Sequence, residues 1–131
     1  MSAVYLTLED VLEIHALQIE RYGGAPEVRD QGLLESALAQ PMATFGGELL
    51  HPDLFSMAAA YLFHIVKNHA FLDGNKRTAL VAGDVCLRLN GHRLVPSEEA
   101  EAFFWSIARG EQNVNDIAQW LRTHTEPFAE E

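Results

Sequence analysis

Residues 69–82 read HAFLDGNKRTALVA, and this stretch decides how the rest of the chain is interpreted. A histidine stands four residues before an aspartate, a Gly-Asn turn follows, and two cations then precede an apolar run. The run is typical of a helix, and the turn before it is typical of a helix start. Residues 69–77, called the motif below, therefore predict a loop that enters a helix N-terminus with a base, a carboxylate and two positive charges.

The segments on either side of the motif also have helical patterns. Upstream, residues 54–66 are apolar almost all round, which predicts a central, buried helix opened by Pro52 or Asp53. Downstream, the helix that begins near Asn75 is expected to run to Leu89, where Asn90 and Gly91 end it.

The remaining chain predicts four more helices, so the fold class is all-α, a compact bundle of about six helices in one domain over residues 1–131. The first begins with a capping box of Thr7 and Asp10 and ends at Gly23-Gly24, and the second is capped by Asp30 and ends at Pro41. The last two are expected at 98–109, capped by Ser97, and at 116–124, capped by Asn115. Residues 42–51 are expected to be an exposed, mobile loop, 126–131 a frayed acidic tail, and 4–6 and 92–95 short extended pieces.

Composition restricts the function classes. The net charge of −10 argues against a general nucleic-acid-binding surface. No apolar run reaches the roughly 18 residues of a membrane span, and the N-terminus lacks the pattern of a signal peptide. Cys86 is the only cysteine, which fits a reducing cytoplasm, and its apolar neighbours predict a buried, inert thiol.

Each part of the motif suits phosphate chemistry. The first backbone N–H groups of a helix lack intrahelical partners and carry partial positive charge, so Gly74 and Asn75 could present them to an anion. Lys76 and Arg77 would add full charge. A histidine side chain can accept a proton from a hydroxyl, so His69 could act as a base, and Asp73 could hold Mg²⁺. Taken singly, each of these features is also typical of an ordinary turn, helix cap or packed side chain.

The motif resembles the signature of the Fic/Doc family, specifically its death-on-curing (Doc) branch. Residues 21–24 and 29–38 also look like the N-terminal part of such proteins, so the resemblance covers most of the chain. It implies a Fic fold with the motif loop between two central helices. It further implies that His69 is the general base on a protein hydroxyl, that Asp73 binds Mg²⁺, and that Gly74, Asn75, Lys76 and Arg77 form a phosphate-binding nest. Lys67, two residues before the histidine, is expected to support that site.

One position separates two activities within the family. Most Fic enzymes have glycine where this chain has Lys76 and a second arginine where it has Leu80. That glycine leaves room for the inner phosphates of ATP, and AMP is transferred. The Doc branch shares the lysine and is known for transferring the terminal phosphoryl group, with elongation factor Tu as its associated target and arrest of translation as the result.

The resemblance also bears on control of the activity. Residues 44–48 and 97–101 have part of the spacing of the inhibitory helix found in many relatives, but neither has its complete pattern. An external inhibitor is therefore expected, a small cognate antitoxin protein such as Doc toxins have.

Four hypotheses remain open from the sequence. The first is a Doc-type protein kinase toxin in the cytoplasm that uses ATP or another nucleoside triphosphate with Mg²⁺. The second is an adenylyltransferase on the same fold, against which Lys76 and Leu80 count. The third is a non-catalytic module that binds a nucleotide or a partner, against which the intact His69 and Asp73 count. The fourth is a metal-binding helical protein, for which the scattered histidines lack ligand spacing.

Overall fold

The computed structural model describes residues 3–129 of the chain. Its helices are α1 (Leu8–Tyr22), α2 (Gln31–Ala39), the short 3₁₀ helix η1 (Gln40–Met42), α3 (Leu54–Asn68), α4 (Asn75–Leu89), α5 (Glu98–Ala108) and α6 (Val114–Thr123). Four short strands pair in twos, β1 (Thr44–Phe45) with β2 (Glu48–Leu49) and β3 (His92–Leu94) with β4 (Thr125–Pro127). The all-α class predicted from the sequence is confirmed.

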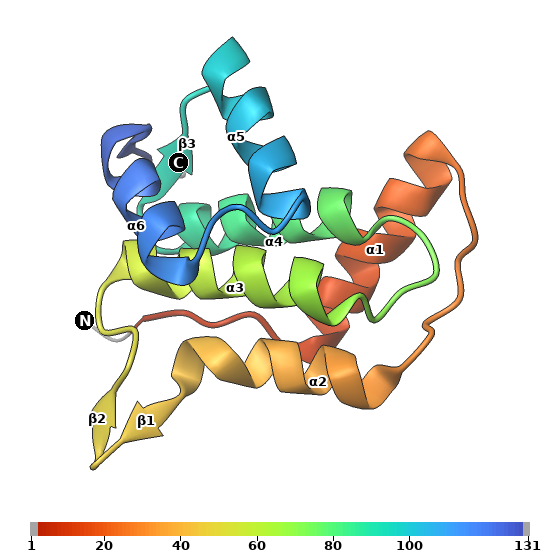
Figure 1. Cartoon of the computed structure of the whole chain (residues 1–131), viewed down its shortest axis with the longest axis horizontal. Coiled ribbons are helices and arrows are strands. Elements are labelled where there is room, and N and C mark those ends of the chain that lie inside the picture. The colour runs from red at the N-terminus through yellow and green to blue at the C-terminus, as the bar shows by residue number, and fades with distance from the viewer. Residues whose placement is uncertain (1–2, 130–131) are drawn as a thin grey trace.

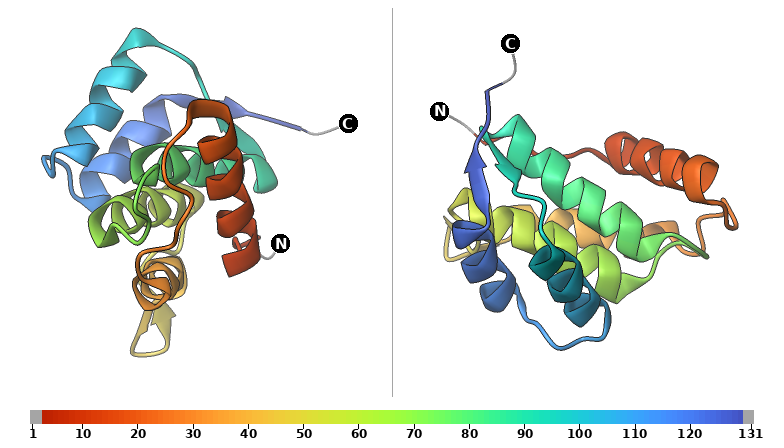
Figure 2. Two further views of the ribbon diagram at one scale, coloured as in Figure 1. Left: turned by 90° about the vertical axis from the view of Figure 1, so that its right-hand side faces the viewer. Right: turned by 90° about the horizontal axis from the view of Figure 1, so that it is seen from above.

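Helix α3 is the centre of the molecule. It contacts α2, α4, α5 and α6, while α1 packs against α4 on the other side (Figures 1 and 2). Its run of Ala58, Ala59, Ala60 and Tyr61 is completely buried, because neighbouring helices cover it nearly all round. The predicted central helix is thus confirmed, and Asp53 caps it by accepting the N–H of Ser56 at 2.9 Å.

Helices α3 and α4 lie side by side, joined by the motif loop, residues 69–74, at one end of the molecule (Figure 1). Their close approach depends on Gly83 of α4, because a Cβ there would stand only 2.8 Å from Cγ of the buried Leu62. The same end of the molecule holds the α1–α2 linker, residues 23–30 (Figure 1).

Most predicted helix ends are confirmed, and one is wrong. The capping box of Thr7 and Asp10 is present, and Asp30 and Ser97 cap α2 and α5. Helix α6, however, is capped by Asn113 and not by Asn115. Asn113 accepts the N–H of Asp116 at 2.8 Å, and Asp116 in return accepts the N–H of Asn113 at 3.0 Å, so the reciprocal pair fixes the earlier start.

Two predictions about irregular segments also need correction. Residues 42–51 are exposed as expected but contain the β1–β2 hairpin, with Gly46 and Gly47 supplying the positive φ angles of its turn. The predicted tail is partly ordered, because β4 pairs with β3 and Arg93 forms an ion pair with Glu126 across the two strands. Residues 130 and 131 of that tail, like Met1 and Ser2, lie outside the described residues.

Two smaller observations concern the cysteine and the hydropathy of the helices. Cys86 is completely buried, and burial raises the pKa of its thiol to about 12, as expected of an inert cysteine. Among residues 3–129, no helix is both long enough and apolar enough to cross a bilayer.

Candidate active site

His69 ends α3 in a backbone conformation that is unusual for its residue type. Its φ and ψ are 48° and 49°, the left-handed region, and within residues 3–129 it is the only non-glycine residue with positive φ. This conformation costs about 1–2 kcal/mol in an L-residue. The guanidinium of Arg29 stabilises it by donating from Nε and Nη2 to the His69 carbonyl, at 2.9 and 2.6 Å, and from Nη2 to the Asn68 carbonyl at 3.2 Å. The imidazole itself belongs to an exposed residue.

The backbone of the motif loop is held along its length by the α1–α2 linker. Val28 and Phe71 form an antiparallel bridge, and the N–H groups of Arg29 and Asp30 both donate to the Ala70 carbonyl, at 2.7 and 3.0 Å. The linker and the loop therefore pair like two short strands, and the loop has a defined shape before any ligand arrives.

Asp73 is fixed from two sides. The Ala25 N–H donates to its Oδ2 at 2.7 Å, and the Nε2–H of His15 donates to its main-chain carbonyl at 2.9 Å. Gly24 allows the linker to come this close, because a Cβ at Gly24 would lie 3.0 Å from Cβ of Asp73. Among the hydrogen bonds of residues 3–129, none occupies Oδ1 of Asp73, so one carboxylate oxygen is available to a cation.

A buried pair of stacked rings, one from α1 and one from the motif loop itself, holds the loop to the core. The rings of His15 and Phe71 stack with centroids 3.7 Å apart and planes 8° apart, and both side chains are buried. Asn75 completes this support, since its Oδ1 accepts the Phe71 N–H at 3.1 Å and its Nδ2 donates to the Phe71 carbonyl at 2.8 Å. The Asn75 side chain is therefore committed to the loop, and only its main-chain N–H faces the helix end.

The N-terminus of α4 lacks the side-chain cap that the other α-helices have. In the described part of the chain, α1, α2, α3, α5 and α6 each begin with a side-chain oxygen that accepts an N–H of the first turn. Helix α4 begins at Gly74, with φ of 81° and no side-chain cap. Its first N–H groups thus remain free for an anion, which the helix dipole also favours.

The two cations of the motif lie on aromatic rings from other helices. Nζ of Lys76 is 3.0 Å from the ring centroid of Trp105 on α5, and Cζ of Arg77 is 4.4 Å from that of Tyr22 on α1. Burial, together with the adjacent guanidinium of Arg77, lowers the pKa of Lys76, and the Glu101 carboxylate opposes that shift. Positive charge is therefore concentrated at the uncapped end of α4.

Lys67 lies on the last turn of α3, with Nζ 5.4 Å from the ring centroid of Phe63. It borders a hollow of about 350 Å³ between the C-terminal ends of α3 and α5, which is lined by Phe63, Val66, Lys67, Ile107, Ala108 and Gly110. Its supporting role toward the phosphate site stays a prediction.

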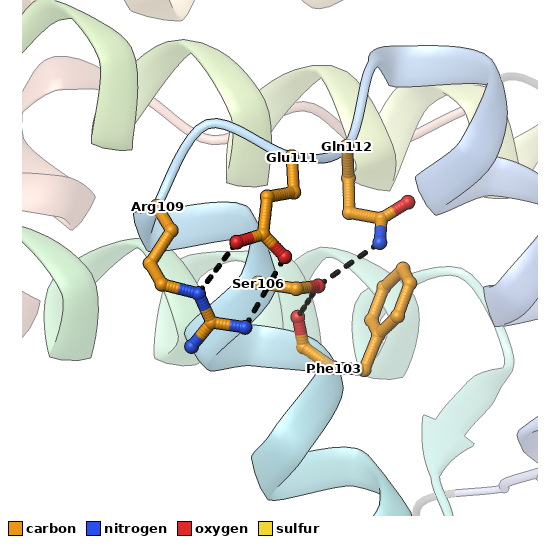
Figure 3. Close-up of polar contacts among 5 residues, drawn as sticks. All are labelled: Phe103, Ser106, Arg109, Glu111 and Gln112. Atoms are coloured by element: carbon orange, nitrogen blue, oxygen red, sulfur yellow. Dashed lines mark hydrogen bonds and ion pairs between the residues drawn. The ribbon is translucent and has the colours of Figure 1, made fainter.

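The C-terminal end of α5, which borders this hollow, is braced by polar contacts (Figure 3). Ser106 donates to the Phe103 carbonyl and accepts from Nε2 of Gln112 at 3.1 Å, while Arg109 forms an ion pair with Glu111 at 2.7 Å. These bonds are local to the end of α5 and to the turn that leads into α6.

The structure thus brings the predicted residues His69, Asp73, Gly74, Lys76 and Arg77 into one loop and the helix start that follows it. The motif alone gave no sign of the residues that support them. His15, which lies outside the motif, is buried and bonds the loop. Arg29 and Tyr22 stood within stretches that resembled the family, whereas Trp105 carried no signal.

Comparisons with known proteins agree with this architecture. The sequence model described as "Fic/DOC family" matches residues 5–87, which include α1 to α3, the whole motif and all but the last two residues of α4. The chain is similar to "Toxin Doc" of Mycolicibacterium smegmatis, with 40% identity over 114 residues, 87% of this chain and 80% of that protein. It is also similar to "Protein kinase doc" of Escherichia phage P1, with 35% identity over 118 residues, 90% of this chain and 93% of that protein.

The helical bundle, with the motif loop between α3 and α4, is consistent with the Fic fold expected from the sequence. The match of the family model and the similarity to both Doc proteins extend over most of the chain. The chain therefore belongs to the Fic/DOC family.

Proposed function

We propose that this chain is a Doc-type toxin that transfers a phosphoryl group from a nucleoside triphosphate to a protein hydroxyl. The observation that carries the proposal is the uncapped N-terminus of α4, with Lys76 and Arg77 beside it and His69 and Asp73 on the loop that leads into it. A nucleotide's phosphates match this arrangement of free N–H groups and two cations. Of the two relatives above, one is named a toxin and the other a protein kinase.

In the proposed reaction, the exposed imidazole of His69 accepts the proton of the target hydroxyl. The hydroxyl oxygen then forms a bond to the terminal phosphorus, the bond from that phosphorus to the bridging oxygen breaks, and the nucleoside diphosphate leaves. The N–H groups of α4, Lys76 and Arg77 stabilise the negative charge on the phosphate oxygens during this exchange.

Magnesium is the cofactor that the site would accept. Within residues 3–129, no three potential metal ligands cluster together, so protein groups alone do not build a complete site. One free oxygen of Asp73, beside bound phosphates and water, is the arrangement that Mg²⁺ commonly adopts with nucleotides. When bound, the ion would neutralise phosphate charge.

Elongation factor Tu is the proposed target of the transfer. The proposed partner is a cognate antitoxin, and the proposed location is the cytoplasm.

The test is to incubate the purified chain with elongation factor Tu, ATP and magnesium, and to read the intact mass of the target. A gain of about 80 Da, one phosphoryl group in place of a hydrogen, would support the proposal. A gain of one AMP would instead identify an adenylyltransferase, and no gain by a chain that binds nucleotide would identify another target or a binding module.

His69→Asn is the matched catalytic control. Asparagine tolerates the left-handed conformation of this position but provides no imidazole base. The variant should fold normally and transfer nothing, and its expression without antitoxin should no longer arrest growth. Transfer at the original rate would remove His69 from the mechanism.

Asp73→Ala should weaken Mg-ATP binding, and an unchanged magnesium dependence would contradict the role of that carboxylate.

A further inference from the structure

The contact between Lys76 and Trp105 joins the phosphate site to a helix that lies outside the motif. Trp105 is 48% exposed, and the buried face of α5 is formed by other residues, namely Ala100, Phe104 and Ile107. The indole is therefore placed at the surface of α5, where the Lys76 ammonium lies over its face. A tryptophan face attracts a cation more strongly than any other aromatic side chain does.

We propose that Trp105 is a positioning residue that sets where Lys76 meets the phosphates of the nucleotide. This inference rests on the proposed function. The indole covers one side of the Lys76 ammonium. Because an ammonium has three N–H donors, those that point away from the ring stay available. An anion can thus bind the lysine without displacing it from the ring.

Two features make this contact effective at Lys76. The lysine stem has four flexible bonds, so a free ammonium would sample many positions, and the ring removes most of that freedom before the nucleotide binds. Glu101, about one turn before Trp105 on α5, also attracts the ammonium, while Arg77 repels it. Both attractive groups come from α5, so this helix forms the wall of the phosphate site that faces the start of α4.

The consequence concerns selectivity among phosphates. If Lys76 determines which phosphate of the nucleotide is presented to His69, then the residue that fixes the ammonium shares in that choice. Trp105 would determine specificity without touching the reacting atoms.

The test is the dissociation constant for Mg-ATP, measured by calorimetry in the absence of a target protein. Trp105→Ala should raise it roughly 2- to 5-fold, the range expected of an exposed cation–π contact. Trp105→Phe, which keeps a ring face, should recover most of that loss. Leu89→Ala is the matched control, because Leu89 is 46% exposed at the opposite end of α4 and should leave the constant unchanged.

A double-mutant cycle then separates positioning from a general structural effect. In a Lys76→Met background, Trp105→Ala should have no further effect on Mg-ATP binding, because the indole acts through the lysine. An equal loss in both backgrounds, or tighter binding by Trp105→Ala, would overturn the inference.

A spectroscopic measurement checks the contact itself without nucleotide. The chain has two tryptophans, so Trp120→Phe leaves Trp105 as the only indole. Adding Lys76→Met to that variant should change the emission of Trp105, and an unchanged spectrum would refute the contact. Failure of the unsubstituted chain to bind Mg-ATP would overturn the proposed function together with this role, whereas normal binding that ignores Trp105→Ala would overturn the inference alone.

Discussion

The substitution His15→Phe would remove one hydrogen bond from beneath the motif loop while keeping an aromatic ring in its place. The Nε2–H of His15 donates to the Asp73 carbonyl at 2.9 Å, and the ring stacks on Phe71. Phenylalanine preserves the stack but leaves the carbonyl without its donor, which should lower the free energy of unfolding by about 1–3 kcal/mol. His15→Ala loses the stack as well, and about 2–4 kcal/mol in total is expected.

The assay is unfolding in urea, monitored by circular dichroism, and the Mg-ATP affinity is measured on the same samples. Because Asp73 would be held less firmly, His15→Phe should also weaken Mg-ATP binding. His124→Phe is the matched control, since the His124 ring stacks on Trp120 at 3.9 Å and bonds the Trp120 carbonyl at 2.8 Å, on α6 and outside the motif loop. That control should lower stability and leave affinity unchanged.

Two results would refute this reasoning. An unchanged free energy of unfolding for His15→Phe would mean that the bond to Asp73 contributes nothing to the fold. A loss of stability with full Mg-ATP affinity would mean that the shape of the loop does not matter to the site.

Three further predictions concern the frame around the site. Gly83→Ala should lower the free energy of unfolding by about 1–2 kcal/mol, because crowding against buried Leu62 outweighs the gain in helix propensity, and Gly83→Val should lower it further, both measured by urea unfolding. Burial lowers the pKa of His64 to about 4, so the imidazole binds a proton more readily in the unfolded chain than in the folded one. The free energy of unfolding should therefore fall as the pH is lowered from 6.5 to about 4 and level off below. His64→Gln should remove this part of the pH dependence. Asp53→Ala should cost about 1 kcal/mol in thermal unfolding by leaving the Ser56 N–H without its cap, whereas a melting temperature equal to that of the unsubstituted chain would contradict the capping role.

Local signals in the sequence were sufficient to predict most of the helices. A side-chain oxygen directly before an apolar, helically spaced run marks a helix start, and Thr7, Asp30, Asp53 and Ser97 all cap as expected. The predicted start of α6 was wrong because Asn113 and Asn115 are both possible caps. Asn113 is the cap in the structure, since it forms the reciprocal pair of hydrogen bonds with Asp116.

Residues 92–95 were predicted to be extended, and β3 covers His92–Leu94, but the pairing of the strands could not be predicted in the same way. The pairing of β3 with β4 joins His92 to Pro127 and Leu94 to Thr125, residues more than 30 positions apart, and neither strand has an alternating pattern of its own. The β1–β2 hairpin has only two residues per strand, too few to show a period in the sequence.

For the site, the sequence predicted which residues would gather but not what holds them. His69, Asp73 and Lys76 are neighbours in the chain, so their proximity follows from the motif. Their orientation depends on Arg29, from the α1–α2 linker, and on Trp105, from α5. Such contacts are invisible to periodicity and spacing, since nothing in a short window specifies a partner tens of residues away.

The pairing of the α1–α2 linker with the motif loop has a consequence for how the protein folds. The bonds that shape the loop join residues 40 to 58 positions apart, as in Arg29 to His69, Ala25 to Asp73 and His15 to Asp73. Closing such long chain segments is slow and entropically unfavourable, so we expect these contacts to form only after α1 has packed against α4 and α2 against α3. A newly synthesised or truncated chain would thus contain the complete motif before its loop is organised, and the chemistry proposed above would require the folded chain.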